Sequence, residues 1–184
     1  MVGFFLIIGK QGSGKTLMST KLALDPYDAD NSIRIFSNYE LFDADFTYIT
    51  FNTALEVNKD KLDILAQLDK DPDFFNNSIM LIDEIHLYLD AYDFMRNNNR
   101  KLQTFFSQLR KRNILLIGTT QYIMNVDIRI RRQCMNVLEM KKVKAPVFQV
   151  DTHDIDGYYT EFISSYFIDL SDYYDRYDTC ELIL

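Results

Sequence analysis

The stretch GKQGSGKT at residues 9–16 decides the fold of this 184-residue chain. It follows the apolar run Val2–Ile8 and precedes Leu17–Leu24, a segment with the apolar spacing of a helix. A glycine, four residues and then Gly-Lys-Thr is the spacing of a loop that wraps the phosphates of a nucleoside triphosphate. The sequence therefore predicts a strand, a phosphate-binding loop and a helix, in that order.

Each residue type in this loop has a physical reason to be there. Glycine adopts positive φ and lets backbone N–H groups approach phosphate oxygens, and the N-terminal end of the next helix favours negative charge. We expect Lys15 to reach the β- and γ-phosphates, the Thr16 hydroxyl to bind Mg²⁺, and the Lys10 side chain to stay in solvent. The predicted cofactors are ATP and Mg²⁺. The predicted nucleotide-binding residues are Gly9, Lys10, Gln11, Gly12, Ser13, Gly14, Lys15 and Thr16.

Charge is distributed unevenly along the chain. The net charge of −7 argues against a general nucleic-acid-binding protein. Residues 1–95 and 145–184 carry −9 and −8, whereas residues 96–144, which we call the basic block, carry +10. Cys134 and Cys180 are too few and too far apart for a zinc cluster or a disulfide framework, so we expect ordinary thiols. The first apolar run leads straight into the phosphate loop, so the sequence predicts no secretory signal, and the longest apolar runs are only strand-sized, so it predicts no membrane span.

The length and the alternation of strands with helices predict one α/β domain over residues 1–184. Asp25-Pro26 is expected to end the first helix. Further strands are expected at Ile33–Ser37, Phe46–Ile49, Ser78–Ile82, Ile114–Gln121 and Tyr158–Ile168, with a hairpin of Cys134–Lys142 and Val147–Asp151. Helices are expected from Asn52 through Leu68 (broken near Lys59-Asp60), at Arg100–Arg112 and at Asn125–Arg132, with Asn97–Asn99 as either a loop or a helix start. The tyrosines after residue 157 are expected to pack on the sheet edge, with partner docking as the alternative.

Two carboxylates follow the apolar strand that begins at Ser78. Ligands of open α/β sheets bind at the C-terminal ends of the strands, so Asp83 is expected to hold the Mg²⁺ shell. Glu84 is expected to polarise the water that attacks the γ-phosphate. Gln121, at the end of the Ile114–Gln121 strand, is expected to contact that water or the γ-phosphate. His86 is expected to be a buried or capping histidine.

These motifs together resemble a known family. The phosphate loop, the strand ending in Asp83-Glu84, and Leu109–Gln121 (LRKRNILLIGTTQ) are similar to the FtsK–HerA superfamily of ring-forming, DNA-pumping ATPases. Asp83–Asp90 (DEIHLYLD) and Arg110–Gln121 resemble its small zonula-occludens-toxin-like members, which include phage and archaeal-virus assembly and genome-packaging proteins. The resemblance implies a P-loop NTPase fold, a three-layer α/β/α sandwich with sheet order 5-1-4-3-2. It covers roughly residues 2–135, an ATPase core, and leaves 136–184 as a C-terminal β-hairpin extension.

The resemblance also implies an arginine that acts between subunits. Arg110 aligns with the arginine finger that reaches the γ-phosphate of a neighbouring subunit, which requires a homo-oligomeric ring, a pentamer or a hexamer. Its rivals for this role, or for contacts to DNA phosphates, are Arg129, Arg131 and Arg132. Filamentous-phage members carry a membrane-spanning segment after the ATPase domain, and this sequence predicts none.

The leading hypothesis is an ATP-hydrolysing motor subunit that moves double-stranded DNA during viral or phage genome packaging or assembly. The basic block would contact DNA phosphates without reading base sequence. We expect a cytoplasmic location in the host, with a virion, procapsid or other assembly partner. The alternatives are an ATP-gated assembly or scaffold protein, a nucleoside kinase and a helicase. A two-domain helicase needs more chain, and the zinc lasso usual in thymidine kinases needs four cysteines.

Overall fold

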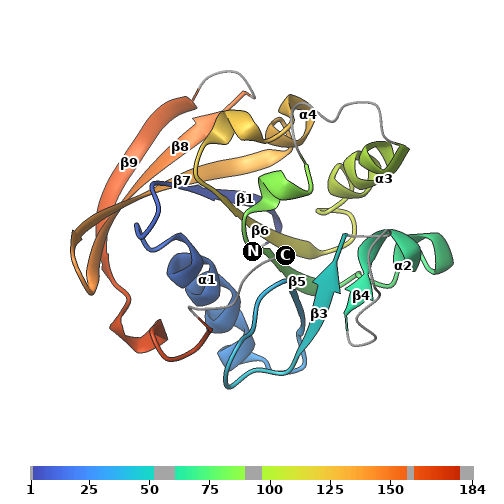
Figure 1. The fold of residues 1–184 in the computed structure, drawn as a ribbon, viewed down its shortest axis with the longest axis horizontal. Coiled ribbons are helices and arrows are strands. Elements are labelled where there is room, and N and C mark those ends of the chain that lie inside the picture. Colours follow the sequence, from blue (N-terminus) through green and yellow to red (C-terminus); the bar gives the residue numbers. More distant parts are fainter. Residues whose placement is uncertain (1, 52–60, 90–96, 157–159, 179–184) are drawn as a thin grey trace.

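A nine-stranded sheet runs through the molecule in the order β4-β3-β2-β5-β6-β1-β7-β8-β9 (Figure 1). The computed structural model describes residues 2–51, 61–89, 97–156 and 160–178. The strands are β1 Gly3–Ile8, β2 Arg34–Ser37, β3 Phe46–Thr50, β4 Leu62–Asp63, β5 Ser78–Ile82, β6 Ile114–Thr120, β7 Cys134–Lys144, β8 Val147–Ile155 and β9 Thr160–Asp169. The helices are α1 Lys15–Ala29, α2 Ile64–Lys70, α3 Asn97–Phe106 and α4 Ile128–Arg131, with 3₁₀ turns at Ile85–Leu87, Ile123–Asn125 and Ser171–Tyr173.

The central strands have the expected order. β7, β1, β6, β5 and β2 are neighbours in that sequence and all of these pairs are parallel. Numbered by their position along the chain, these five strands read 5-1-4-3-2, as the resemblance implies. The full sheet differs in detail, because parallel β3 and β4 extend one side and antiparallel β8 and β9 extend the other. The α/β P-loop fold is confirmed.

Helices cover both faces of the sheet, which makes three layers. α1 buries Leu17 and Leu24 against alternate side chains of β1 and β6, and α3 buries Leu102 and Phe105 in a second core on the opposite face. β5 and β6 are buried at every position, which explains why they read as continuous apolar runs rather than alternating ones. Each such leucine, isoleucine or phenylalanine contributes about 1.5–3 kcal/mol by leaving water.

The expected C-terminal hairpin is present and is longer than predicted. β7 pairs antiparallel with β8, and β8 pairs antiparallel with β9, which is the outermost strand. β7 also pairs parallel with β1, so one strand belongs both to the central sheet and to the hairpin. The expected boundary between core and extension, at residue 135, falls inside β7. The division of the chain at that point stays a prediction.

The expectation that Asp25-Pro26 ends the first helix is wrong. α1 continues through Pro26 to Ala29, although proline cannot donate the backbone hydrogen bond of a helix interior. The last turn of α1 is held by contacts with residues outside the helix. Tyr27 is buried, and its hydroxyl accepts a hydrogen bond from the backbone N–H of Asp45 at 3.0 Å. Tertiary packing thus overrides the local signal.

Three other element boundaries also differ from expectation. Leu62, expected in a helix, lies in β4 opposite Ile49, and the Asp63 carboxylate caps α2 by accepting from Ala66 N. Residues 52–60 of that expected helix lie outside the described residues. α3 begins at Asn97, one of the two alternatives expected for Asn97–Asn99, but it ends at Phe106 rather than at Arg112, after which the chain turns into β6. The helix expected at Asn125–Arg132 is reduced to α4, because the 3₁₀ turn and the extended Val126 precede it.

Candidate nucleotide-binding site

The loop between β1 and α1 has the backbone that phosphate binding needs. Gly14 immediately precedes α1 with φ 88°, a left-handed conformation that favours glycine. A Cβ added to Gly14 would lie 2.8 Å from the ring of Phe148 in β8, and one added to Gly9 would lie 2.7 Å from the Met140 carbonyl oxygen in β7. The loop therefore lies directly against the β7–β8 hairpin, and no side chain fits between them.

Polar groups of the loop converge at the start of α1. Lys15 is 7% exposed, and its Nζ donates to the Lys10 carbonyl at 3.3 Å. The Ser13 hydroxyl is buried and has no hydrogen-bond partner among the described residues. A buried hydroxyl without a hydrogen-bond partner costs free energy unless a ligand supplies that partner. The loop therefore fits a bound phosphate group, whose oxygens can accept from Ser13. Lys10 is exposed, as expected.

Asp83 lies opposite Thr16, although 67 positions separate them in sequence. The Thr16 hydroxyl donates to Asp83 Oδ2 at 3.2 Å, and the Thr119 hydroxyl at the end of β6 donates to Oδ1. The Asn38 side chain fixes the backbone of Asp83, since its Oδ1 accepts from Asp83 N at 2.7 Å and its Nδ2 donates to Asp83 O at 2.9 Å. A hydroxyl and a carboxylate at this separation fit the oxygen ligands that Mg²⁺ prefers. The two predicted metal ligands are thus brought together.

Glu84 stands beside this pair in a strained conformation. Its φ is 48°, uncommon for a residue other than glycine, and its N–H donates to Thr119 Oγ1 at 3.0 Å. The Oε2 atom is buried without a hydrogen bond and lies 3.3 Å from Nδ1 of His86. That Nδ1 is also 3.1 Å from the Thr120 hydroxyl. A carboxylate kept partly buried and incompletely satisfied is suited to accept a proton from water.

The remaining predicted residues lie apart from this group. Gln121 is exposed just beyond the end of β6. It lies at the C-terminal ends of the strands, as Asp83 and the loop do. Arg110 is exposed at the opposite, N-terminal ends of the central strands. There it lines a hollow with Gly3 and Met135, at the starts of β1 and β7. The length of β6, about 20 Å at 3.3 Å per residue, separates Arg110 from the nucleotide loop of its own chain.

The rival arginines Arg129 and Arg131 contact residues just before α4. Arg129 binds the Asp127 carboxylate through Nε and Nη2 at 3.0 and 2.6 Å. This ion pair and the accompanying hydrogen bonds lower the pKa of Asp127 and raise that of Arg129. Arg131 is buried, and its Nε donates to the Val126 carbonyl. Arg132 is exposed and lines the same hollow as Arg110.

Sequence reasoning missed the residues that hold the acidic pair in place. Thr119 bonds both Asp83 and the backbone of Glu84, and Asn38 follows the neighbouring strand β2. Their signal was present, because each is a polar residue at the C-terminal end of an apolar strand. Phe148 carried no such signal, since only the fold places β8 against Gly14.

Tyrosines on the α1 side of the sheet are held neutral near this site. The hydroxyl of Tyr39 bonds Ser19 and Thr20 of α1, and burial raises its pKa well above the usual value. Burial, with the nearby Asp83 carboxylate, raises the pKa of Tyr177 to about 12. Both rings therefore remain uncharged at physiological pH and add no negative charge beside Asp83.

Comparison with known proteins agrees with this geometry. The family model described as "ATPase family associated with various cellular activities (AAA)" matches residues 5–143. The N-terminal domain of zonular occludens toxin from Neisseria meningitidis superimposes with a TM-score of 0.68 at 22% identity, covering 97% of this chain and 100% of that one. No curated protein matches the sequence.

Viral proteins share the same fold. The DNA-packaging ATPase B204 of Sulfolobus turreted icosahedral virus gives a TM-score of 0.56 at 12% identity, covering 88% of this chain and 97% of that one. The genome-packaging NTPase B204 of Sulfolobus turreted icosahedral virus 2, in complex with ATP-gammaS, gives 0.56 at 14% identity, covering 88% and 96%. In the described residues, no helix has the length and apolarity to cross a membrane. The resemblance to zonula-occludens-toxin-like P-loop ATPases is confirmed, and the chain belongs to the AAA family of ATPases.

Proposed function

We propose that this ATPase is the subunit of a ring-shaped motor that translocates double-stranded DNA, in viral or phage genome packaging or assembly. The observation that carries the proposal is that Thr16, Asp83 and Glu84 lie together at the C-terminal ends of the central strands. The exposed Arg110 and Arg132 lie at the opposite ends of these strands. Similar folds occur in proteins described as a DNA-packaging ATPase and a genome-packaging NTPase.

Hydrolysis follows from the positions of these side chains. The loop N–H groups and Lys15 would hold the β- and γ-phosphates, and Thr16 and Asp83 would hold Mg²⁺, which would neutralise charge on the phosphate oxygens. Glu84 takes a proton from the water that attacks the γ-phosphorus, and the bond to the β-phosphate oxygen breaks to leave ADP. Gln121, at the same edge, orients that water.

A second subunit completes the site. Because Arg110 lies a strand length from its own loop, it serves as a finger only when it reaches the γ-phosphate of a neighbour. Arg132 lines the same hollow as Arg110 and is the second candidate by position, because the hollow lies at the end of the strands opposite the nucleotide loop. We propose that the subunits form a ring, a pentamer or a hexamer, in which each subunit supplies this arginine to its neighbour.

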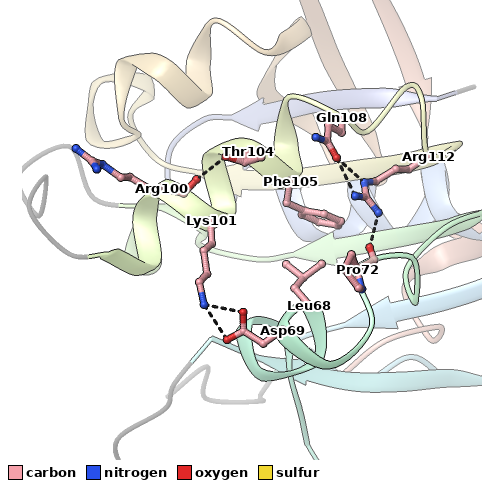
Figure 2. Close-up of a pocket in the computed structure, with 9 residues that line it drawn as sticks. All are labelled: Leu68, Asp69, Pro72, Arg100, Lys101, Thr104, Phe105, Gln108 and Arg112. Carbon is pink, nitrogen blue, oxygen red and sulfur yellow. Dashed lines mark hydrogen bonds and ion pairs between the residues drawn. The ribbon is translucent and has the colours of Figure 1, made fainter.

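DNA would contact the exposed part of the basic block. Arg100 and Lys101 are exposed on α3, and Lys111 lies in the turn before β6. Figure 2 shows that Lys101 is committed to Asp69 at 2.6 and 2.7 Å, whereas the guanidinium of Arg100 points away from the pocket between α2 and α3. Arg112, on the other side of that pocket, donates to Gln108 and to the Pro72 carbonyl. On this face of the molecule we therefore assign the phosphate contacts to Arg100 and Lys111 rather than to Lys101 and Arg112.

ATPase activity measured with and without double-stranded DNA tests the proposal. We expect linear duplex DNA to stimulate turnover, and the stimulation to fall with salt because phosphate contacts release counterions. Arg100→Ala with Lys111→Ala should abolish stimulation while basal turnover remains. Particles of ring size should appear with a non-hydrolysable ATP analogue. ATP turnover that DNA leaves unchanged, with assembly that follows ATP binding alone, would contradict the motor and favour an ATP-gated scaffold.

A further inference from the structure

We propose that His86 is a positioning residue for ATP hydrolysis, which holds the Glu84 carboxylate in place through its Nδ1 atom. The sequence predicts only a buried or capping role for this histidine, and the hydrolysis proposed for the site does not use it. Its Nδ1 lies 3.3 Å from Oε2 of Glu84. This inference rests on the proposed role of Glu84 as the base and does not depend on DNA translocation.

The 3₁₀ turn that carries His86 packs closely on β6. Ile85 is fully buried, and its Cδ1 lies 2.8 Å from the position that a Cβ on Gly118 would occupy. Because Gly118 has no side chain, the turn can approach β6 this closely. The Leu87 N–H donates to the Glu84 carbonyl at 2.9 Å, which closes the turn. The backbone of this turn therefore sets the His86 ring beside the Glu84 side chain.

Thr120 contacts the same nitrogen of the imidazole ring. This residue is fully buried at the end of β6, and its Oγ1 lies 3.1 Å from Nδ1 of His86. The Thr120 hydroxyl also donates to the Tyr122 carbonyl at 3.4 Å. An Nδ1 lone pair facing the Glu84 carboxylate would be repelled, so we assign the ring proton to Nδ1. His86 then donates to the Thr120 oxygen, and this bond fixes the orientation of the ring.

This arrangement holds one oxygen of Glu84 and leaves the other for water. Oε2, the atom beside His86, is buried and makes no hydrogen bond among the described residues, whereas the Glu84 side chain as a whole is 25% exposed. The positive end of the Nδ1–H dipole attracts Oε2 toward the ring. Oε1 is then the oxygen that accepts the proton from the attacking water. His86 keeps its own proton throughout and acts only through Glu84.

Steady-state ATPase kinetics of three His86 variants test this role. Misplacing a reacting group by about 1 Å can cost on the order of 10²-fold in rate. We therefore expect His86→Ala to lower kcat on the order of 10- to 100-fold and to leave KM for ATP within about twofold, because the phosphate loop is untouched. His86→Asn should recover most of kcat, since its amide N–H takes the position of Nδ1. His86→Gln should not, because its amide lies one bond farther out.

The other histidine of the chain offers a matched control. Nε2 of His153, in β8, lies 3.6 Å from Oε2 of Glu139, which makes a histidine–glutamate pair of the same kind. His153→Ala should keep kcat. Thermal unfolding checks that each variant is folded at the assay temperature. If His86→Ala does not fold, the comparison of His86→Asn with His86→Gln carries the test.

A double-mutant cycle tests whether His86 acts through Glu84. In single-turnover hydrolysis, His86→Ala should cause no further loss in a Glu84→Gln background. A further loss as large as in the wild type, an unchanged or higher kcat in His86→Ala, or equal rates for His86→Asn and His86→Gln would overturn the positioning role. Hydrolysis by Glu84→Gln at the wild-type rate would overturn the base itself and this inference with it. Slow hydrolysis by Glu84→Gln together with full activity of His86→Ala would overturn the positioning role alone.

Discussion

The Thr119 hydroxyl supports the acidic pair, and Thr119→Val should expose that role. The side chain is fully buried, donates to Asp83 Oδ1 and accepts from Glu84 N at 3.0 Å. Valine keeps the shape and removes both bonds. A bond to a charged group is worth about 1.5–3 kcal/mol, and the orphaned N–H adds a penalty, so we expect a loss of about 2–4 kcal/mol. For a chain of this size, Tm should fall by roughly 4–16 °C.

The same substitution should also slow catalysis. Without the hydroxyl, the Asp83 carboxylate keeps its contact to Thr16 but loses the partner on its other oxygen. A displacement that costs the transition state about 1.4 kcal/mol lowers kcat tenfold, and we expect at least this loss, with KM for ATP little changed.

Ser78→Ala is the matched control. Ser78 is buried at the start of β5, at the end of the strands opposite the nucleotide site. Its hydroxyl donates to the Phe75 carbonyl at 2.5 Å. This variant should lose stability and keep kcat. Steady-state ATPase kinetics and thermal unfolding measure both effects. If Thr119→Val loses stability but keeps kcat within about twofold, like the control, then Thr119 supports the fold alone and the reasoning is refuted.

Three further predictions concern the loop, the hairpin and the neighbouring subunit. Gly14→Ala should weaken ATP binding far more than Gly12→Ala in a nucleotide titration, because both residues have positive φ but only at Gly14 would a Cβ strike Phe148; equal losses would contradict this. Hydrogen bonds from Lys141, Ser165 and Gln149 lower the pKa of Asp151. The stability they contribute is therefore present above the unfolded-state pKa of about 3.9 and is lost as pH falls through the depressed folded pKa. Asp151→Asn should be less stable at neutral pH, and in urea titrations the difference in stability should shrink progressively as pH falls below about 4; a difference that stays constant there refutes these hydrogen bonds as its source. Arg110→Ala should lower turnover on the order of 10³-fold in assembled protein, and mixing it with Lys15→Ala should restore activity, because one subunit supplies the loop and the other the arginine. No recovery on mixing would argue against a finger acting between subunits.

The sequence predicted the parts of the fold that local chemistry determines. The glycine-rich loop has the spacing of a phosphate-binding loop, and the two fully buried strands, Ser78–Ile82 and Ile114–Thr120, contain the runs of four apolar residues typical of central strands. Both strands lie beside β1 or each other in the expected order, and Thr16 meets Asp83 as expected. The ends of elements were less predictable, because packing decides them. Pro26 lies inside α1 since buried Tyr27 anchors the last turn, and Leu62 lies in β4 since β3 offers it a pairing edge.

The contacts of the site with distant strands could not be predicted from local patterns. Phe148 reaches Gly14 across 134 positions of sequence only because β7 joins the central sheet and returns as β8. The long-range hydrogen bonds of Asn38 to Asp83 likewise depend on β2 lying next to β5. Residue types at strand ends marked these positions as candidates, but the sheet order was needed to join them.

The most direct test of the site is single-turnover ATP hydrolysis by Glu84→Gln. Glutamine keeps the size of the side chain and cannot accept the proton from the attacking water. We predict that the variant binds ATP with an affinity within a few-fold of the wild type and hydrolyses it on the order of 10²–10⁴ times more slowly. Hydrolysis at the wild-type rate with ATP bound normally would contradict the assignment of Glu84 as the base.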